Sequence, residues 1–273
     1  MIPAPFSYLR AYSVDEALAL AAEHGDEAKF LAGGHSLLPL MKLRLAQPEV
    51  LIDLAPLREL NYIRDAGGHI AIGALTRHHD LEQSALLAEA VPLLAYAAGQ
   101  VGDPQIRHRG TLGGSLAHGD PASDLPAVIL ALDATLVARG PSGQREIAAA
   151  GFFAGLFETA LEPDELLVEI RVPTSAAAGW SFQKFTKRAI DWAIVGVAVQ
   201  GGSVALVNMA STPVRAAAVE RALASGAGPR DAAAHAADGT SPVEDINATP
   251  AYREHLARVL TGRALEEAAR RAG

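Results

Sequence analysis

The sequence predicts a two-domain protein of mixed helices and strands: an α/β or α+β domain comes first, and a smaller domain of strands followed by helices comes second. The chain has 273 residues, more than a typical single domain. Helical segments rich in alanine and leucine alternate with apolar segments that turn at glycine pairs, as β-hairpins do. Small residues dominate at 173–179. We therefore expect domains at 1–176 and 177–273.

The first elements of the chain have clear boundary signals. Ser13 and Glu16 fit a capping box at the start of a helix, which Gly25 ends after His24. Apolar runs predict the elements that follow, and the Ala-Gly-Gly sequence at 66–68 predicts a hairpin turn. These expected elements are a strand at 29–32, a helix opening at 37–45, a strand at 50–54 and a hairpin at 60–74.

The later elements are predicted by the same kinds of signal. The sequence Gly-Pro-Ser-Gly at 140–143 predicts a second hairpin turn, and Pro173 stops a strand. Gly201 and Gly202 predict a turn between two antiparallel strands of Val, Ile and Ala. Residues 225–250 are polar and poor in helix signals. The elements are helices at 76–84 and 86–100, a hairpin at 133–148, strands at 166–172, 180–185, 192–200 and 203–210, and helices at 214–224 and 252–271.

The composition excludes several classes of function. A net charge of −8 argues against a nucleic-acid surface and against docking on anionic lipid. No apolar run reaches the roughly 18 residues that span a bilayer, and the first residues lack an export signal, so we expect a cytoplasmic location. The chain has no cysteine, which removes disulfides, thiol nucleophiles and thiolate-held zinc or iron–sulfur clusters. Redox chemistry would need an organic cofactor, or metal centres on another polypeptide.

Two glycine-rich segments carry most of the functional signal. They are residues 32–36 (Ala-Gly-Gly-His-Ser) and 111–115 (Thr-Leu-Gly-Gly-Ser), which we call the first and second glycine segments. Glycine lets bare backbone N–H groups approach an anionic ligand such as a diphosphate. Neither segment is G-x-G-x-x-G or a P-loop, so the Rossmann and P-loop interpretations lose their support. The segments predict either an adenine dinucleotide held from two sides by another fold, or plain tight turns.

The charged residues near these segments have two interpretations each. Lys29 either places a positive charge near a phosphate or is a solvated lysine on a strand. Asp120 and Asp124 either accept hydrogen bonds from ribose or ribityl hydroxyls, or belong to a helix N-terminus that Ser123 or Asp124 caps.

The spacing of the histidines does not indicate a metal site. His78 and His79 are adjacent on an expected helix, so their side chains diverge by about 100°, and no third ligand is evident in the sequence. We expect a solvated or capping role for this pair, and surface positions for His235 and His255. The G-x-S-x-G motif of hydrolases is absent from the sequence.

Two long motifs carry a resemblance to a known family. Residues 32–44, Ala-Gly-Gly-His-Ser-Leu-Leu-Pro-Leu-Met-Lys-Leu-Arg, and residues 103–127, which include Arg-Gly-Thr-Leu-Gly-Gly-Ser, strongly resemble the FAD-binding medium subunits of molybdenum hydroxylases. This group includes aerobic carbon monoxide dehydrogenase, whose medium subunit is the most similar, and the flavin portion of xanthine dehydrogenase. The resemblance implies an α+β fold: a two-lobed FAD-binding domain of the PCMH type, then a small C-terminal domain of an antiparallel sheet packed with helices.

The resemblance also implies which residues bind FAD. In that family the first glycine segment surrounds the diphosphate and the second lies on the other side of the cofactor. Trp192 matches a position where an aromatic side chain covers the isoalloxazine ring, although a tryptophan opening an apolar strand is more often a core residue. With Lys29 from the preceding strand, the expected cofactor-binding residues are Lys29, Ala32, Gly33, Gly34, His35, Ser36, Leu37, Gly110, Thr111, Gly113, Gly114, Ser115, Asp124, Leu167 (or Leu166), Lys184, Asp191 and Trp192.

Three of the motif residues need separate comment. Ser115 stands where many relatives have asparagine, so we expect a weaker or water-mediated hydrogen bond there. The role of His118 is open. In more distant oxidases of the same flavin fold, a histidine placed like His35 is joined covalently to FAD. The molybdenum hydroxylase branch holds its flavin non-covalently, and we expect the same here.

The resemblance implies a division of labour among the subunits of a larger enzyme, assembled as a dimer of heterotrimers. A large partner would oxidise the substrate at a molybdenum cofactor, and a small partner would relay electrons through two 2Fe–2S clusters. This chain would accept the electrons on FAD and pass them to an external acceptor; we expect no catalytic acid or base and no metal on it. The substrate and the acceptor stay open.

Two alternatives to the subunit interpretation remain. A free-standing FAD-dependent oxidase would carry its own substrate pocket, usually in a larger second domain than this chain has. An assembly subunit that has lost its flavin is a different class of protein, and the two intact glycine segments argue against it.

Overall fold

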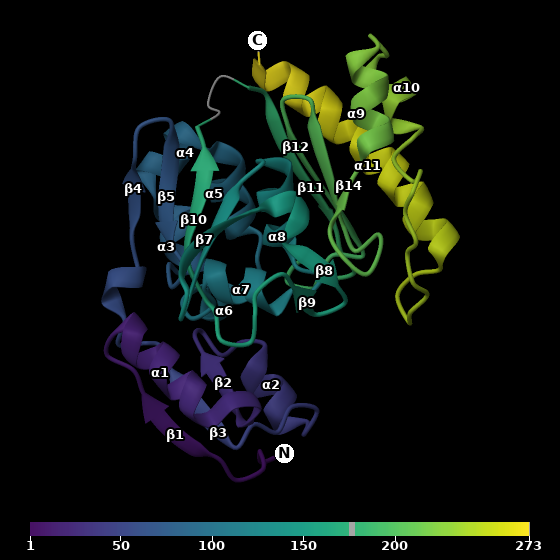
Figure 1. The fold of residues 1–273 in the computed structure, drawn as a ribbon. Helices are drawn as coiled ribbons and strands as arrows, with labels where there is room; N and C mark the ends of the chain where they lie inside the picture. The colour runs from purple at the N-terminus through teal and green to yellow at the C-terminus, as the bar shows by residue number, and fades with distance from the viewer. Residues whose placement is uncertain (175–177, 273) are drawn as a thin grey trace.

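Figure 1 shows three parts that follow each other along the chain: an N-terminal lobe at the bottom, a central lobe, and a C-terminal domain at the upper right. The structure is a computed structural model that describes residues 1–174 and 178–272. The boundary predicted between residues 176 and 177 lies outside the described residues. Each helix within those described ranges is too short or too polar to cross a lipid bilayer.

The N-terminal lobe is a three-stranded parallel sheet with helices beside it. The N-cap half of the predicted capping box is present, because the Ser13 hydroxyl accepts a hydrogen bond from the Glu16 N–H at 3.1 Å. The Glu16 carboxylate accepts from the N–H of Tyr12, one residue before the N-cap, at 2.7 Å. Gly25 follows the helix with a φ of +51°, which favours glycine. In sheet order the strands are β1 (Ser7–Arg10), β3 (Val50–Asp53) and β2 (Ala28–Leu31), the helices are α1 (Val14–His24) and α2 (Leu37–Lys42), and 3₁₀ turns occupy Gly25–Glu27 and Arg58–Leu60.

The central lobe combines a five-stranded antiparallel sheet with six helices, most of which share its hydrophobic core. Both predicted hairpins are present, and the strand predicted at 166–172 lies between them. In sheet order the strands are β4 (Ile63–Asp65), β5 (His69–Gly73), β10 (Leu166–Pro173), β6 (Thr135–Gly140) and β7 (Gly143–Ala148). The helices are α3 (His78–Gln83), α4 (Ala85–Ala90), α5 (Pro92–Gly99), α6 (Pro104–Arg107), α7 (Leu112–His118) and α8 (Asp124–Ala131). A 3₁₀ turn at Ala149–Gly151 and a small hairpin, β8 (Phe153–Gly155) and β9 (Glu158–Thr159), complete the lobe.

Two elements of the central lobe differ from the prediction. The helix expected at 86–100 is the pair α4 and α5, because Pro92 has no N–H to donate to the preceding turn and instead starts a new helix. The second glycine segment, which we interpreted as a loop, forms the N-terminus of α7. Thr111 is the N-cap of that helix, and its hydroxyl accepts a hydrogen bond from the Gly114 N–H at 3.2 Å.

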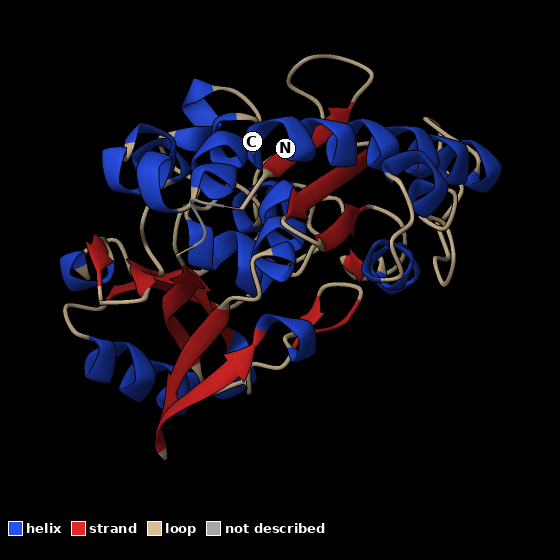
Figure 2. Ribbon diagram, turned by 90° about the horizontal axis from the view of Figure 1, so that it is seen from above, coloured by secondary structure: helices blue, strands red, loops and turns tan. Residues whose placement is uncertain are grey.

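The C-terminal domain is a four-stranded antiparallel sheet that is covered on both faces. Val197 and Val199 belong to the core formed with the long C-terminal helix, whereas Ala198 between them belongs to the core of the central lobe. Seen from above, the long helix lies along one side of this sheet and central-lobe helices fill the space between the two large sheets (Figure 2). In sheet order the strands are β11 (Trp180–Phe185), β12 (Val195–Gln200), β13 (Ser203–Val207) and β14 (Val214–Arg215), and the helices are α9 (Ala217–Ala224), α10 (Pro229–Ala233) and α11 (Pro250–Ala272).

These elements confirm the predicted α+β fold class. Two details of the C-terminal domain were not predicted. The segment expected as a helix at 214–224 begins with the short strand β14, and the polar segment at 225–250 contains the short helix α10, which Pro229 begins.

Candidate functional site

All the residues that we expected to bind a cofactor line one cavity of about 470 Å³. Its walls come from the three parts of the molecule: the N-terminal lobe supplies the first glycine segment, the central lobe supplies α7, α8 and β10, and the C-terminal domain supplies β11 and the residues before β12. A cavity of this size and mixed polarity is typical of a site for a large organic ligand. Lining residues that we did not predict include Phe30, Leu31, Leu75, His78, Val101, Ile106, Leu161, Glu165 and Ile190.

The first glycine segment brings bare backbone to the cavity. It lies between β2 and α2, and Gly34 has a φ of +78°, which a residue with a side chain rarely adopts. In the described part of the chain, the N–H groups of residues 33–36 donate no hydrogen bond to another backbone or side-chain group. Such a row of free donors in a cavity wall suits the oxygens of a phosphate chain.

The first glycine segment packs directly against the residues that lead into the second. A β-carbon built on Gly33 would lie 2.3 Å from the carbonyl oxygen of Arg109 and 2.8 Å from the α-carbon of Gly110. On the second segment, a β-carbon on Gly113 would lie 2.7 Å from the carbonyl oxygen of Ala74, which accepts a hydrogen bond from the Gly113 N–H at 2.8 Å. The glycines therefore permit close packing of backbone on backbone, and this packing forms one side of the cavity.

An ion pair between the two domains lies at the other side of the cavity. Lys184 Nζ of β11 lies 2.7 Å from Asp124 Oδ2 of α8, and it also donates to the Gln100 carbonyl oxygen at 3.0 Å. The exposed fractions of the two side chains are 9% for Lys184 and 6% for Asp124. Burial raises the pKa of Asp124, and the charge of Lys184 opposes this rise. Asp124 Oδ1 is buried and has no partner among the described residues, so it can accept a hydrogen bond from a ligand hydroxyl.

The capping interpretation of this region is not supported by the structure. Ser123 occupies the N-cap position of α8, but its side chain makes no capping hydrogen bond. The carboxylate of Asp120 instead accepts from the Ala122 N–H at 2.9 Å, within its own turn. Asp120 thus shapes the loop before α8, while Asp124 lines the cavity.

The prediction of a solvated or capping role is wrong for His78. Its side chain is buried and lines the cavity, with its ring against Gly110. Burial, with smaller effects of the nearby His35 and Arg107, lowers the pKa of His78 to about 4, so the ring is neutral near pH 7. Its Nδ1 has no hydrogen-bond partner among the described residues. The sequence has no signal for this burial, because it depends on the absence of a side chain at Gly110.

The other histidines make ring contacts or surface ion pairs. The described residues contain no group of three or more His, Asp or Glu side chains that could hold a metal ion. The His79 ring packs on the His108 ring with 4.0 Å between their centroids. His118 lies at the cavity beside Phe157, with ring centroids 5.1 Å apart. His235 is exposed, as we predicted, and pairs with Asp238.

Trp192 is a cavity residue and not a core residue. Its side chain is 57% exposed and lies beside Asp191 in the segment that leads into β12. The backbone just after it is held firmly: the Asn208 side chain donates to the Ala193 carbonyl oxygen at 2.9 Å, and the buried Arg253 donates to the Ile194 carbonyl oxygen. An exposed aromatic ring on a fixed backbone can stack on a planar ligand.

Comparison with known proteins agrees with this site. Residues 4–175 match the family described as FAD binding domain in molybdopterin dehydrogenase, and residues 180–268 match the CO dehydrogenase flavoprotein C-terminal domain. The chain is 44% identical to the carbon monoxide dehydrogenase medium chain of Hydrogenophaga pseudoflava over 98% of both chains. It is 40% identical to the 6-hydroxypseudooxynicotine dehydrogenase complex subunit alpha of Paenarthrobacter nicotinovorans, over 100% of this chain and 97% of that one.

Solved structures give the same result. The carbon monoxide dehydrogenase of Hydrogenophaga pseudoflava superposes with a TM-score of 0.96 over 100% of both chains. The quinoline 2-oxidoreductase of Pseudomonas putida 86, at 32% identity, superposes with a TM-score of 0.93 over 100% of this chain and 99% of that one. Both domains and their order are therefore shared along the whole length. The chain belongs to the family of FAD-binding subunits of molybdenum-containing dehydrogenases.

Proposed function

We propose that this chain is the flavoprotein subunit of a molybdenum hydroxylase of the carbon monoxide dehydrogenase type, and that its cavity holds FAD non-covalently. The observation that carries the proposal is the single cavity in which two glycine segments, a buried ion pair and an exposed tryptophan meet. When bound, FAD would allow electrons that arrive singly to leave as a pair. The protein contributes binding, orientation and protection from side reactions.

The cavity residues fit the chemistry of FAD. The free N–H groups of residues 33–36 would bind the diphosphate, and Lys29 would add a positive charge beside it. Asp124 Oδ1 would accept from a hydroxyl of the ribityl or ribose group. Trp192 would cover the isoalloxazine ring. These assignments extend to the remaining predicted residues, which line the same cavity: Ala32, Leu37, Gly110, Thr111, Gly113, Gly114, Ser115, Leu167 and Asp191.

The electrons would come from partner subunits. The chain has no cysteine and so cannot hold an iron–sulfur cluster through thiolates. Names such as medium chain and subunit alpha place the relatives in multi-subunit dehydrogenases. We therefore propose a small partner that carries 2Fe–2S clusters and a large partner that carries the molybdenum cofactor, assembled as a dimer of heterotrimers. The division of the chain at residues 176 and 177 and its cytoplasmic location stay predictions.

The substrate would be selected by the large partner. Relatives named for carbon monoxide, 6-hydroxypseudooxynicotine and quinoline share 32–44% identity with this chain over nearly its full length. Such uniform similarity fits a subunit that handles electrons and never contacts the substrate. A free-standing oxidase is less well supported, because α8 and α11 cover the two faces of the C-terminal sheet and leave no open face for a substrate.

Spectroscopy of the purified chain tests the cofactor. We expect an absorbance band at about 450 nm, and FAD in the supernatant after acid precipitation. A coloured precipitate would instead mean a covalent bond at His35, and a colourless protein that still binds its partners would be an assembly subunit. Mixing the flavin-loaded chain with reduced small subunit tests the electron path: bleaching of the band is expected, and a stable band would contradict the proposed role.

A further inference from the structure

Helix α8 of the central lobe packs directly against the C-terminal domain. All eight of its residues are buried, and it packs on β12 and β13 of the C-terminal sheet as well as on α5 and α7 of the central lobe. At 1.5 Å per residue it is a rod of about 12 Å. Its first residue, Asp124, lines the cavity, and the chain leaves its last turn through Asp133, which has a φ of +51°.

The C-terminal sheet supplies a cation to each end of this rod. Lys184 lies on β11, one edge strand of the sheet, and pairs with Asp124 at the amino end of α8. Arg215 lies on β14, the other edge strand, and binds the carboxyl end. The two contacts also suit the helix dipole, because a carboxylate lies at the amino end and a guanidinium lies at the carboxyl end.

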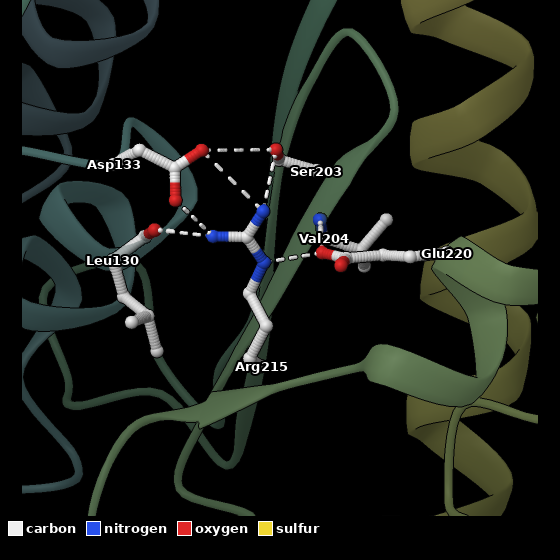
Figure 3. Close-up of polar contacts among 6 residues, drawn as sticks. All are labelled: Leu130, Asp133, Ser203, Val204, Arg215 and Glu220. Atoms are coloured by element: carbon white, nitrogen blue, oxygen red, sulfur yellow. Dashed lines mark hydrogen bonds and ion pairs between the residues drawn. The ribbon is translucent and has the colours of Figure 1, made fainter. Parts of the chain in front are cut away.

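Each nitrogen of the Arg215 guanidinium donates to at least one acceptor (Figure 3). Its Nη1 donates to the Leu130 carbonyl oxygen at 3.0 Å and to Asp133 Oδ1 at 2.5 Å. Its Nη2 donates to the Ser203 hydroxyl at 2.7 Å, and its Nε donates to Glu220, which also accepts from the Val204 N–H at 2.8 Å. The planar guanidinium therefore fixes the end of α8 to β13, β14 and α9 in one geometry.

The middle of the sheet face between these two contacts carries small side chains. Ala198 and Ala205, on β12 and β13, share the core that contains α8, and the larger Phe182 of β11 and Val207 of β13 belong to the same core. The side chains of Val197, Val199, Val204 and Leu206 instead belong to the core formed with α11. The alanines allow α8 to pack closely but give few ridges to stop the helix from sliding. The position of α8 along the sheet then depends on its two polar ends together with Phe182 and Val207.

We infer that Arg215 is a positioning residue for the cofactor cavity: by fixing the carboxyl end of α8 to β14, it sets how α8 lies on the C-terminal sheet and so places Lys184 against Asp124. The inference rests on the proposed function for its ligand, but the coupling between the two ends of α8 belongs to the protein alone. Arg215 itself does not line the cavity.

A double-mutant cycle on the full chain tests this coupling. The variants are Arg215→Met, Lys184→Met and both together, and the measurement is the FAD dissociation constant by flavin fluorescence. We expect Arg215→Met to raise the FAD dissociation constant about tenfold in the wild-type background. In the Lys184→Met background the same change should have little further effect, because both substitutions disturb the placement of Lys184 against Asp124. Effects that multiply in the double variant, or unchanged binding in Arg215→Met, would overturn the inference.

Two further variants separate positioning from general stability. Arg258→Met removes an exposed arginine that pairs with Glu254 on α11 of the same domain, and it should leave FAD binding unchanged. Arg215→Lys keeps the charge near Asp133 but loses the planar fork of the guanidinium, so we expect an FAD dissociation constant between those of the wild type and Arg215→Met. This variant carries the test if Arg215→Met folds poorly.

Hydrogen exchange without cofactor makes the test independent of FAD. In Arg215→Met we expect faster amide exchange at β11 around Lys184 and at the first turn of α8, and in Arg258→Met no change there. Unchanged exchange in Arg215→Met would overturn the coupling. A wild-type chain that binds no FAD, yet shows the expected exchange pattern, would overturn the proposed function and leave the coupling supported.

Discussion

Gly33 lies against the carbonyl oxygen of Arg109 so closely that a β-carbon on Gly33 would come within 2.3 Å of that oxygen. The contact joins the N-terminal lobe to the central lobe with no side chain between them. Two motifs far apart in sequence are thereby held side by side, and the cavity lies where they meet.

Replacing Gly33 with alanine should push the first glycine segment away from Arg109 and Gly110. The added methyl group must displace backbone, so we expect a loss of about 2–3 kcal/mol in the free energy of unfolding and almost complete loss of bound flavin. Denaturant unfolding and flavin content per chain are the measurements. Gly151→Ala is the matched control, because a β-carbon there meets nothing within 4 Å. Wild-type flavin content in Gly33→Ala would refute the assignment of the first glycine segment.

Removing the Trp192 side chain should affect the cofactor and not the fold. The ring is 57% exposed, so Trp192→Ala should change the free energy of unfolding by less than about 1 kcal/mol. Loss of stacking should weaken FAD binding and increase the fluorescence of bound flavin, while Trp192→Phe should retain most of both properties. Ile246→Ala, at another exposed apolar residue, is the control. Equal flavin fluorescence in wild type and Trp192→Ala would place the ring away from the isoalloxazine.

His78 should make the chain less stable in acid. Its pKa is about 4 in the folded protein and 6.5 in the unfolded chain, so the unfolded chain binds more protons between these values. The free energy of unfolding should therefore fall as the pH drops from about 6.5 to about 4, by up to about 3 kcal/mol. In His78→Gln this fall should be smaller, and His235→Gln, at an exposed position, is the control for the loss of a histidine. The same pH slope in His78→Gln as in wild type would contradict the prediction.

Arg253 should be the most costly arginine to remove from α11. Its side chain is 1% exposed, lies 2.7 Å from Asp245 and donates to the Ile194 carbonyl oxygen just beyond Trp192. Arg253→Met removes a buried cation that holds both of these acceptors, and we expect a loss of about 3 kcal/mol in the free energy of unfolding. Arg258→Met on the same helix should cost less than about 1 kcal/mol. Similar losses in both variants would show that the Arg253 contacts contribute little.

Local signals predicted the parts of the structure that depend on neighbouring residues. The Ser13 N-cap, the hairpin turns and the strand at 180–185 are set by residues close in sequence, and the structure confirms them. The residues that line the cavity could also be predicted, because each glycine segment lies within a long motif, at residues 32–44 and 103–127, that resembles a known family.

Features that depend on distant contacts could not be predicted in the same way. His78 is buried because Gly110 leaves room for its ring, and α7 tolerates Gly113 because that residue packs on Ala74. Neither partner is close in sequence. Arg215 likewise looks like any surface arginine until β14 is placed beside the end of α8.

The three-part wall of the cavity also sets an order of events during synthesis. The first glycine segment is made early, but Lys184 and Trp192 follow the two lobes in the sequence, and the sheet beside them needs the later helix α11 to complete the core behind it. A growing chain can therefore present half of the site long before it can close it. Full enclosure of a cofactor therefore has to wait until the C-terminal domain has folded against the two lobes made before it.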